Sequence, residues 1–196
     1  YNGKTAFEDN VTFTAPDGTK IGVFGLDTPE TATKAHPAKI QGVTFLSGDE
    51  LVECAQEQVD ALEAEGCDVV VCLGHLGIDE ESTGNRSVDL LAKVSGIDLF
   101  IDGHSHSTIE MEMVKNKDGK EIPLSSTGTK LVNIGKLTIS NGVFTTELVS
   151  DYAAKDDTAD AFVKSIQEKN EALVNTVVAR TSVDLTTKHS DGTRAI

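Results

Sequence analysis

Cysteine is scarce in this sequence of 196 residues: only Cys54, Cys67 and Cys72 are present, and no two of them have the Cys-x-x-Cys spacing. Three cysteines at these positions do not make a disulfide framework. Cys67 and Cys72 lie beside or within an apolar stretch, which favours small buried side chains over metal ligands or a bridge. We therefore interpret these two cysteines as part of a core.

Basic residues are also few, with 17 lysines and arginines against 32 acidic residues and a formal net charge of -15. This balance argues against nucleic acid or an anionic membrane surface as a partner. An anionic substrate would be repelled at long range unless bound metal cations reversed the charge locally.

Long apolar runs are missing as well. No run approaches the roughly 18 residues of a membrane-spanning helix, so no membrane insertion is expected in this segment. The hydrophobic content of 38% is that of a globular domain with a core. We expect both ends to be cuts in a longer protein, because the chain begins at Tyr1 and stops at Ile196 after a polar, turn-like stretch. A missing signal peptide then says nothing about export.

Histidines follow two of the apolar stretches that are present. Residues 97–101 predict a buried strand, and His104 and His106 come shortly after it. In extended backbone, side chains two residues apart point to the same side, so these two imidazoles could reach one small volume. A second strand pattern, residues 69–73, ends in a similar way at His75.

The segments around these strands predict an α/β fold. A capping box from Ser47 to Glu50 opens a helix that Gly66 ends, and a second helix is predicted over residues 87–94. The apolar face of the first helix consists of Leu51, Ala55, Val59 and Leu62. The β-α-β order predicts parallel strands with a right-handed crossover. Because ligands bind at the carboxyl ends of such strands, the three histidines are expected along one sheet edge.

Antiparallel hairpins are predicted on both sides of this parallel part. The predicted strand pairs are residues 11–15 with 20–26, residues 110–114 with 121–124, and residues 130–140 with 143–149. Asn141-Gly142 between the last two strands is a strong hairpin signal. The two later hairpins are expected at a sheet edge or in a second sheet.

The last part of the chain predicts a helix and a further strand. Residues 156–158 supply acidic and capping side chains for a helix that reaches about Leu173. Its expected inner side consists of Ala161, Phe162, Ile166 and Leu173. Residues 176–185 are expected to form a strand, and a polar loop follows.

Metal ligation is the first hypothesis for the three histidines. A single histidine is more often a hydrogen-bonded structural residue, but three placed just past two adjacent strands favour ligation. Neutral imidazole is a good ligand for Zn and other borderline divalent metals. His36 and His189 lie in polar loops without ligand spacing, so we predict that they are ordinary exposed histidines. The spacing alone leaves the number of metals and the chemistry open.

Two motifs resemble the last two signature blocks of the calcineurin-like metallophosphoesterases. These motifs are Gly-His-Leu-Gly at residues 74–77 and Asp-Gly-His-Ser-His at residues 102–106. The similarity is greatest to the secreted bacterial 5′-nucleotidase, UDP-sugar hydrolase and 2′,3′-cyclic nucleotide phosphodiesterase group, and it extends to residues 20–28 and 128–137. It implies half of an α/β/β/α sandwich, with parallel strands plus antiparallel hairpins.

The resemblance implies a two-metal site. His75 and His104 would ligate one metal and His106 the other, and Asp102 is a candidate to orient the ligand rings. The full-length protein would hold two divalent ions (Zn, Mn, Co or Ca), and this piece none or one. The group's general-acid histidine and bridging aspartate are expected before Tyr1, so no catalytic residue is expected in this chain.

The resemblance also implies a division of the chain. Residues 1–154 would be the C-terminal half of the metallophosphoesterase domain, residues 155–175 a linker helix, and residues 176–196 the truncated start of the 5′-nucleotidase C-terminal domain. Without the other half, the exposed sheet edge favours self-association, and the piece alone is expected to be inactive.

The implied activity is hydrolysis of a nucleotide or other phosphate ester by water activated between two metals about 3.5–4 Å apart. The parent protein would be extracellular, at the cell surface or periplasmic. Action on 2′,3′-cyclic nucleotides or UDP-sugars remains open within the family. From a different class, a non-catalytic surface binding module on the same fold also remains open.

Overall fold

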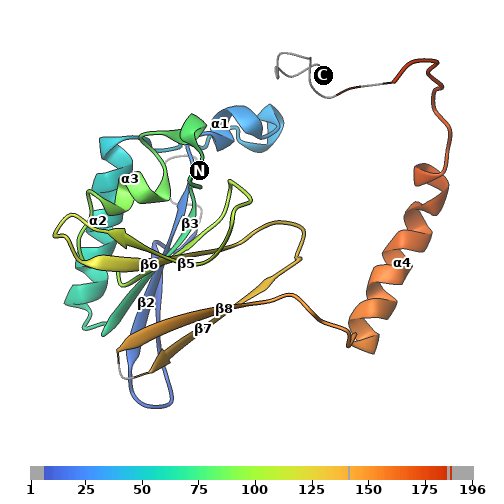
Figure 1. The fold of residues 1–196 in the computed structure, drawn as a ribbon. Coiled ribbons are helices and arrows are strands. Elements are labelled where there is room, and N and C mark those ends of the chain that lie inside the picture. Colours follow the sequence, from blue (N-terminus) through green and yellow to red (C-terminus); the bar gives the residue numbers. More distant parts are fainter. Residues whose placement is uncertain (1–6, 141, 185, 187–196) are drawn as a thin grey trace. The chain divides into compact units, whose positions relative to one another are not determined.

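The chain divides into two compact units, residues 1–150 and residues 151–196. The computed structural model describes residues 7–140, 142–184 and 186 (Figure 1). His189 and the polar loop predicted near it lie outside these residues. Within the described ranges, no helix combines the length and the apolar character that crossing a bilayer requires.

A six-stranded mixed sheet forms the centre of the first unit, in the order β1-β2-β3-β4-β6-β5. Its strands are β1 (Asn10–Thr14), β2 (Lys20–Asp27), β3 (Val69–His75), β4 (Leu99–Asp102), β5 (Thr108–Lys115) and β6 (Glu121–Thr127). The pairs β2–β3, β3–β4 and β4–β6 are parallel, whereas β1–β2 and β5–β6 are antiparallel. This arrangement confirms the predicted α/β class, the first two hairpins and the parallel β-α-β unit.

Helices cover one face of this sheet (Figure 1). The longest is α2 (Asp49–Ala64), whose predicted apolar face is confirmed as buried. This face packs with Phe24 of β2 and Phe100 of β4 in one continuous core. The shorter elements are α1 (Thr31–Lys34), η1 (Pro37–Lys39), η2 (Glu80–Ser82) and α3 (Ser87–Leu91). α3 ends three residues before the predicted position.

The predicted capping box at the start of α2 is wrong. Gly48 occupies the N-cap position instead of Ser47, and it has no side chain with which to accept an N–H of the first turn. Its φ of 55° suits glycine, and its own N–H donates to Asn85 Oδ1 at 2.9 Å. This tertiary hydrogen bond moves the helix start by one residue. Asp49 and Glu50 stay in the first turn, where the helix dipole favours carboxylates.

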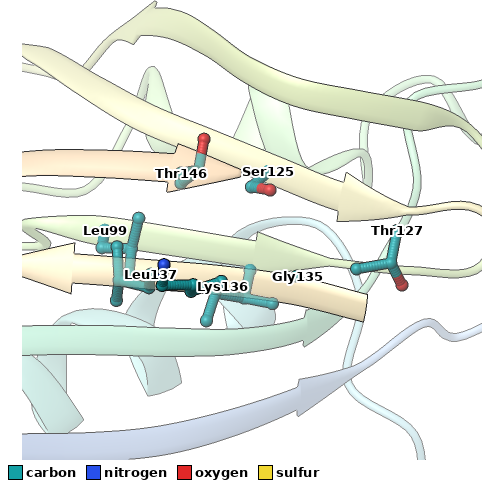
Figure 2. Close-up of a pocket in the computed structure, with 8 residues that line it drawn as sticks. Leu99, Ser125, Thr127, Gly135, Lys136, Leu137 and Thr146 are labelled. Carbon is teal, nitrogen blue, oxygen red and sulfur yellow. The ribbon is translucent and has the colours of Figure 1, made fainter. Parts of the chain in front are cut away.

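A second, two-stranded sheet lies over the other face of the main sheet. Its strands β7 (Ile134–Ser140) and β8 (Val143–Val149) form the third predicted hairpin, but the first strand begins at Ile134 instead of residue 130. Asn141 of the predicted turn lies outside the described residues. Apolar side chains of the hairpin, including Leu137 and Phe144, pack against the buried cluster of Val69, Val71 and Leu99. A cavity of about 100 Å³ lies between the layers (Figure 2). It is lined by Leu99, Ile101, Ser125, Thr127, Gly135, Lys136, Leu137 and Thr146.

The second unit contains α4 (Asp157–Val174). Its start confirms the predicted capping, because the Asp156 carboxylate accepts the N–H of Ala159 at 2.8 Å. Among the described residues of this unit nothing covers the predicted inner side, and Ala161, Phe162, Ile166 and Leu173 are all exposed there. Residues 176–184 also form no strand, since a strand needs a neighbour to satisfy its backbone groups and this segment pairs with none among the described residues. Leu185 lies outside the described residues.

Gly74 in β3 provides a direct test of the core. A Cβ at this position would lie 2.3 Å from Cε1 of the buried Phe100 ring. We predict that Gly74→Ala lowers the free energy of unfolding by roughly 1–3 kcal/mol through overpacking. Gly25→Ala on neighbouring β2 is the matched control, because a Cβ there would meet only Leu73 O at 3.8 Å. Urea denaturation measures both, and equal midpoints for the two variants would contradict this packing.

Candidate metal centre

The carboxyl ends of three parallel strands bring two of the predicted ligands together. β2 and β3 are paired up to Asp27 and His75, and β4 ends next to them at Asp102, two residues before His104. His75 Nε2 and His104 Nδ1 are 3.3 Å apart. The two rings have centroids 5.0 Å apart and an interplanar angle of 66°. The expectation that both lie at one sheet edge is therefore confirmed, while their ligand role stays a prediction.

His106 does not share this arrangement. The extended backbone from which we placed His104 and His106 on one side is wrong: their φ angles are 75° and 56°. Such left-handed conformations are uncommon for residues other than glycine and occur in tight turns. The turn forms directly after β4, where the Ser105 N–H donates to Gly103 O at 3.0 Å. His106 is exposed, and within the described ranges it has no hydrogen bond to either of the other two imidazoles.

Asp102 joins the two histidine loops through the backbone. Its Oδ1 accepts the N–H groups of Leu76 and Gly77 at 3.1 Å each and that of Gly103 at 2.8 Å. Leu76 and Gly77 follow His75 directly, and Gly103 precedes His104. The carboxylate is buried, with 8% of the residue exposed, so these hydrogen bonds form away from water. Asp102 thus holds the backbone on both sides of the site. The sequence had suggested a different role, in which Asp102 orients the imidazole rings themselves.

Glycines of both motifs allow the loops to touch. Gly77 has a φ of 75°, and a Cβ there would lie 3.0 Å from Ser105 N. A Cβ at Gly103 would lie 3.2 Å from Nδ1 of His75. Side chains at these two positions would push the loops apart, so the glycines set the separation of the two imidazoles.

Glu30 is a site residue that the sequence did not reveal. Its Oε2 lies 3.0 Å from Nε2 of His104, and its Oε1 accepts the hydroxyl of Ser82. The ammonium of Lys34 lies 2.5 Å from the same carboxylate. Lys34, Ser82 and His104 together lower the pKa of Glu30 to about 2, with Lys34 making the largest contribution. No spacing pattern links positions 30 and 104, which come together only because β2 and β4 flank β3 and end at the same edge of the sheet.

The remaining histidines are outside this cluster. His36 accepts the N–H of Ala38 through Nδ1 at 3.2 Å and so caps the short η1 turn. His36 is exposed, as the sequence predicted. His189 lies outside the described residues.

Imidazole nitrogens are suitable ligands for a borderline divalent metal, but the described residues supply too few of them at one point to form a complete site. Two nitrogens bound about 2.0–2.1 Å from a tetrahedral Zn²⁺ would lie about 3.3–3.4 Å apart, which is the separation seen between His75 and His104. Glu30 contacts the opposite nitrogen of the His104 ring, so these three side chains do not converge on one point. Across the described residues, no group of three or more His, Cys, Asp and Glu side chains is arranged to hold a metal ion.

Sequence comparison identifies relatives of the chain, although no family profile matches it. It is 39% identical over 104 residues to the trifunctional nucleotide phosphoesterase YfkN of Bacillus subtilis, which covers 52% of this chain and 6% of that protein. It is 33% identical over 91 residues to a 5′-nucleotidase of Diplobatis ommata, covering 46% of this chain and 14% of the relative. It is 31% identical over 144 residues to a 5′-nucleotidase of Vibrio parahaemolyticus, covering 66% of this chain and 25% of the relative.

The chain is thus similar in sequence to phosphoesterases of the 5′-nucleotidase group. Its fold agrees with this relationship. The calcineurin-like phosphoesterase YfkN of Bacillus subtilis superposes with a TM-score of 0.65 at 21% identity, over 89% of this chain and 61% of that one. A structure from Staphylococcus aureus, described as a putative 5′-nucleotidase, gives a TM-score of 0.64 at 24% identity. The superposition covers 86% of this chain and 35% of that one. The chain thus spans only a part of each of these members of the group.

The Asp102 hydrogen bonds generate a second prediction. Asp102→Ala leaves three backbone N–H groups without their acceptor and should lower the free energy of unfolding by roughly 3–5 kcal/mol. Asp98→Ala is the control, since Asp98 Oδ2 accepts one strand N–H, that of Val70. Denaturant unfolding and amide hydrogen exchange measure the effect. The amides of Leu76, Gly77 and Gly103 should exchange faster than in wild type, and unchanged exchange at these three amides would contradict the assignment.

Proposed function

We propose that this chain is part of a metal-dependent phosphoesterase that hydrolyses nucleotide phosphate esters. His75 and His104 ligate one divalent metal, and His106 ligates a second. The observation that carries the proposal is the 3.3 Å contact between His75 Nε2 and His104 Nδ1 at the carboxyl edge of the parallel sheet. The homology to nucleotide phosphoesterases supports the same reaction class.

The proposal gives His75, His104 and Asp102 different roles. His75 and His104 present ring nitrogens toward a common volume, and Asp102 holds the backbone next to both of them. Two divalent ions, when bound, supply a hydroxide nucleophile and neutralise charge on the phosphate. Such cations also offset the net charge of -15, which otherwise repels an anionic substrate. We assign the bridging carboxylate and the general-acid histidine to sequence before Tyr1.

The substrate proposal rests on the names of the relatives. They include a nucleotide phosphoesterase, 5′-nucleotidases and an apyrase, so a nucleotide monophosphate is the first substrate to test. Hydrolysis of 2′,3′-cyclic nucleotides or UDP-sugars is the alternative within the group. Snake venom 5′-nucleotidases are among the relatives, which supports an extracellular, cell-surface or periplasmic location. We retain 155–175 as a linker helix before a 5′-nucleotidase C-terminal domain.

Substitution of single histidines in the full-length protein tests this function. His104→Ala and His75→Ala should each reduce metal content and lower nucleotidase activity by roughly 100-fold or more, because each removes a ligand. His36→Ala is the matched control and should keep activity within about twofold of wild type, since His36 caps a separate turn. Metal analysis and a phosphate-release assay measure both quantities. A metal-replete His104→Ala variant with wild-type turnover would contradict the ligand assignment.

Activity measurements on the full-length wild type also distinguish an enzyme from a non-catalytic binding module. The products to measure are phosphate and nucleoside from a nucleotide monophosphate, a nucleoside 2′- or 3′-monophosphate from a 2′,3′-cyclic nucleotide, and UMP with a sugar 1-phosphate from a UDP-sugar. A wild type that binds metal and nucleotide but forms none of these products would favour the binding module.

The 196-residue chain by itself should be inactive. Its described residues bring together two imidazoles and no bridging carboxylate, so it is expected to bind at most one metal loosely. Apolar side chains exposed on edge strand β1, such as Val11 and Phe13, also favour self-association. A phosphate-release assay and light scattering on the purified chain check both expectations. Turnover of a nucleotide monophosphate at about 1–1000 per second, the range of typical enzymes, would refute the first.

A further inference from the structure

Glu30, which sequence analysis did not identify, contacts the side of the His104 ring that faces away from His75. Glu30 contacts Nε2 of His104 at 3.0 Å, while Nδ1 of the same ring faces His75 at 3.3 Å. We propose that Glu30 is a positioning residue that fixes the His104 ring and its proton, so that Nδ1 is the nitrogen offered to a metal. This inference rests on the proposed ligand role of His104 and adds a residue to it.

Hydrogen-bond chemistry determines where the proton lies. A carboxylate only accepts hydrogen bonds, so the ring nitrogen 3.0 Å from Glu30 Oε2 must carry a hydrogen and donate it. A neutral imidazole has one N–H, and Nδ1 of His104 is therefore left with its lone pair. That lone pair is on the side of the ring that faces His75. The carboxylate thus selects the ring form in which both histidines can direct a nitrogen to one ion.

Glu30 is itself held in place by three neighbours. The Ser82 hydroxyl donates to its Oε1, and the Lys34 ammonium lies 2.5 Å from its carboxylate. Its backbone N–H donates to the hydroxyl of Thr28 at 3.3 Å. Thr28 is buried, and its own N–H donates to the carbonyl oxygen of His75 at 3.0 Å. Glu30 therefore stands on a segment that is tied to one histidine while its side chain holds the other.

A carboxylate in contact with a ligand histidine changes the properties of the imidazole ring. It prevents rotation of the imidazole, fixes its tautomer and increases the basicity of the free nitrogen. Loss of a partner of this kind usually lowers metal affinity by about 10–100-fold. A residue needed only for folding would change stability without changing the protonation of one particular ring nitrogen.

Three variants of the full chain separate these possibilities. Glu30→Ala removes the acceptor, and Glu30→Gln keeps one oxygen that can accept the ring N–H. Glu81→Ala is the matched control, because Glu81 is an exposed carboxylate adjacent to Ser82. The first readout is ¹⁵N NMR of histidine-labelled, metal-free protein, which shows whether the Nε2 proton of His104 is retained against exchange with water. The second is calorimetric titration with Zn²⁺.

We expect a slowly exchanging Nε2 proton on His104 in wild type and in Glu81→Ala, and its loss in Glu30→Ala. Zinc affinity should fall about 10–100-fold in Glu30→Ala and recover to within roughly 10-fold of wild type in Glu30→Gln. A proton on Nδ1 of His104 in wild type, or unchanged zinc affinity in Glu30→Ala, would overturn the proposal. A wild type that binds no zinc would contradict the proposed metal site instead, and the ring-proton signal would still decide the role of Glu30.

Discussion

One buried carboxylate oxygen, Oδ1 of Asp102, accepts three backbone N–H groups, and the geometry of the whole site depends on it. The three donors belong to two loops that leave neighbouring parallel strands. Parallel pairing brings the strand ends to one edge, but pairing alone does not control the paths of the loops beyond that edge. The shared acceptor does, and the glycines on either side let the loops come close enough to use it. The contact between His75 and His104 follows from this local closure of the backbone.

The sheet architecture was predictable because its signals are local. The alternating and apolar runs of β1 to β6, the glycine that ends α2 and the β-α-β order each lie within a short stretch of sequence. The predicted cap at Ser47 is wrong because a residue 37 positions away, Asn85, binds the backbone of Gly48. The apolar face predicted for α4 is not buried within its own unit, and a 3.6-residue repeat indicates such a face without naming what covers it.

The same distinction explains the prediction of the site. His75 and His104 were found because both follow recognisable strands and carry a motif. His106 was placed by an extended-backbone rule, which fails here because His104 and His106 both adopt positive φ in a tight turn. Glu30 follows a different strand and lies 74 positions from His104 in the sequence, so its contact with that ring exists only in three dimensions. Function could be inferred at the level of a reaction class from motifs and homology, while the contacts that tune the ring nitrogens required coordinates.

The order of the strands also bears on how the site comes into being. Glu30, His75 and His104 come from three chain segments that meet only when β2, β3 and β4 have paired in parallel. Such pairing closes long loops and is slow compared with helix or hairpin formation. The two imidazoles therefore become neighbours late in folding, after the central sheet has assembled. An ion that needs both of them cannot nucleate the fold: it can only trap the finished sheet and slow its opening.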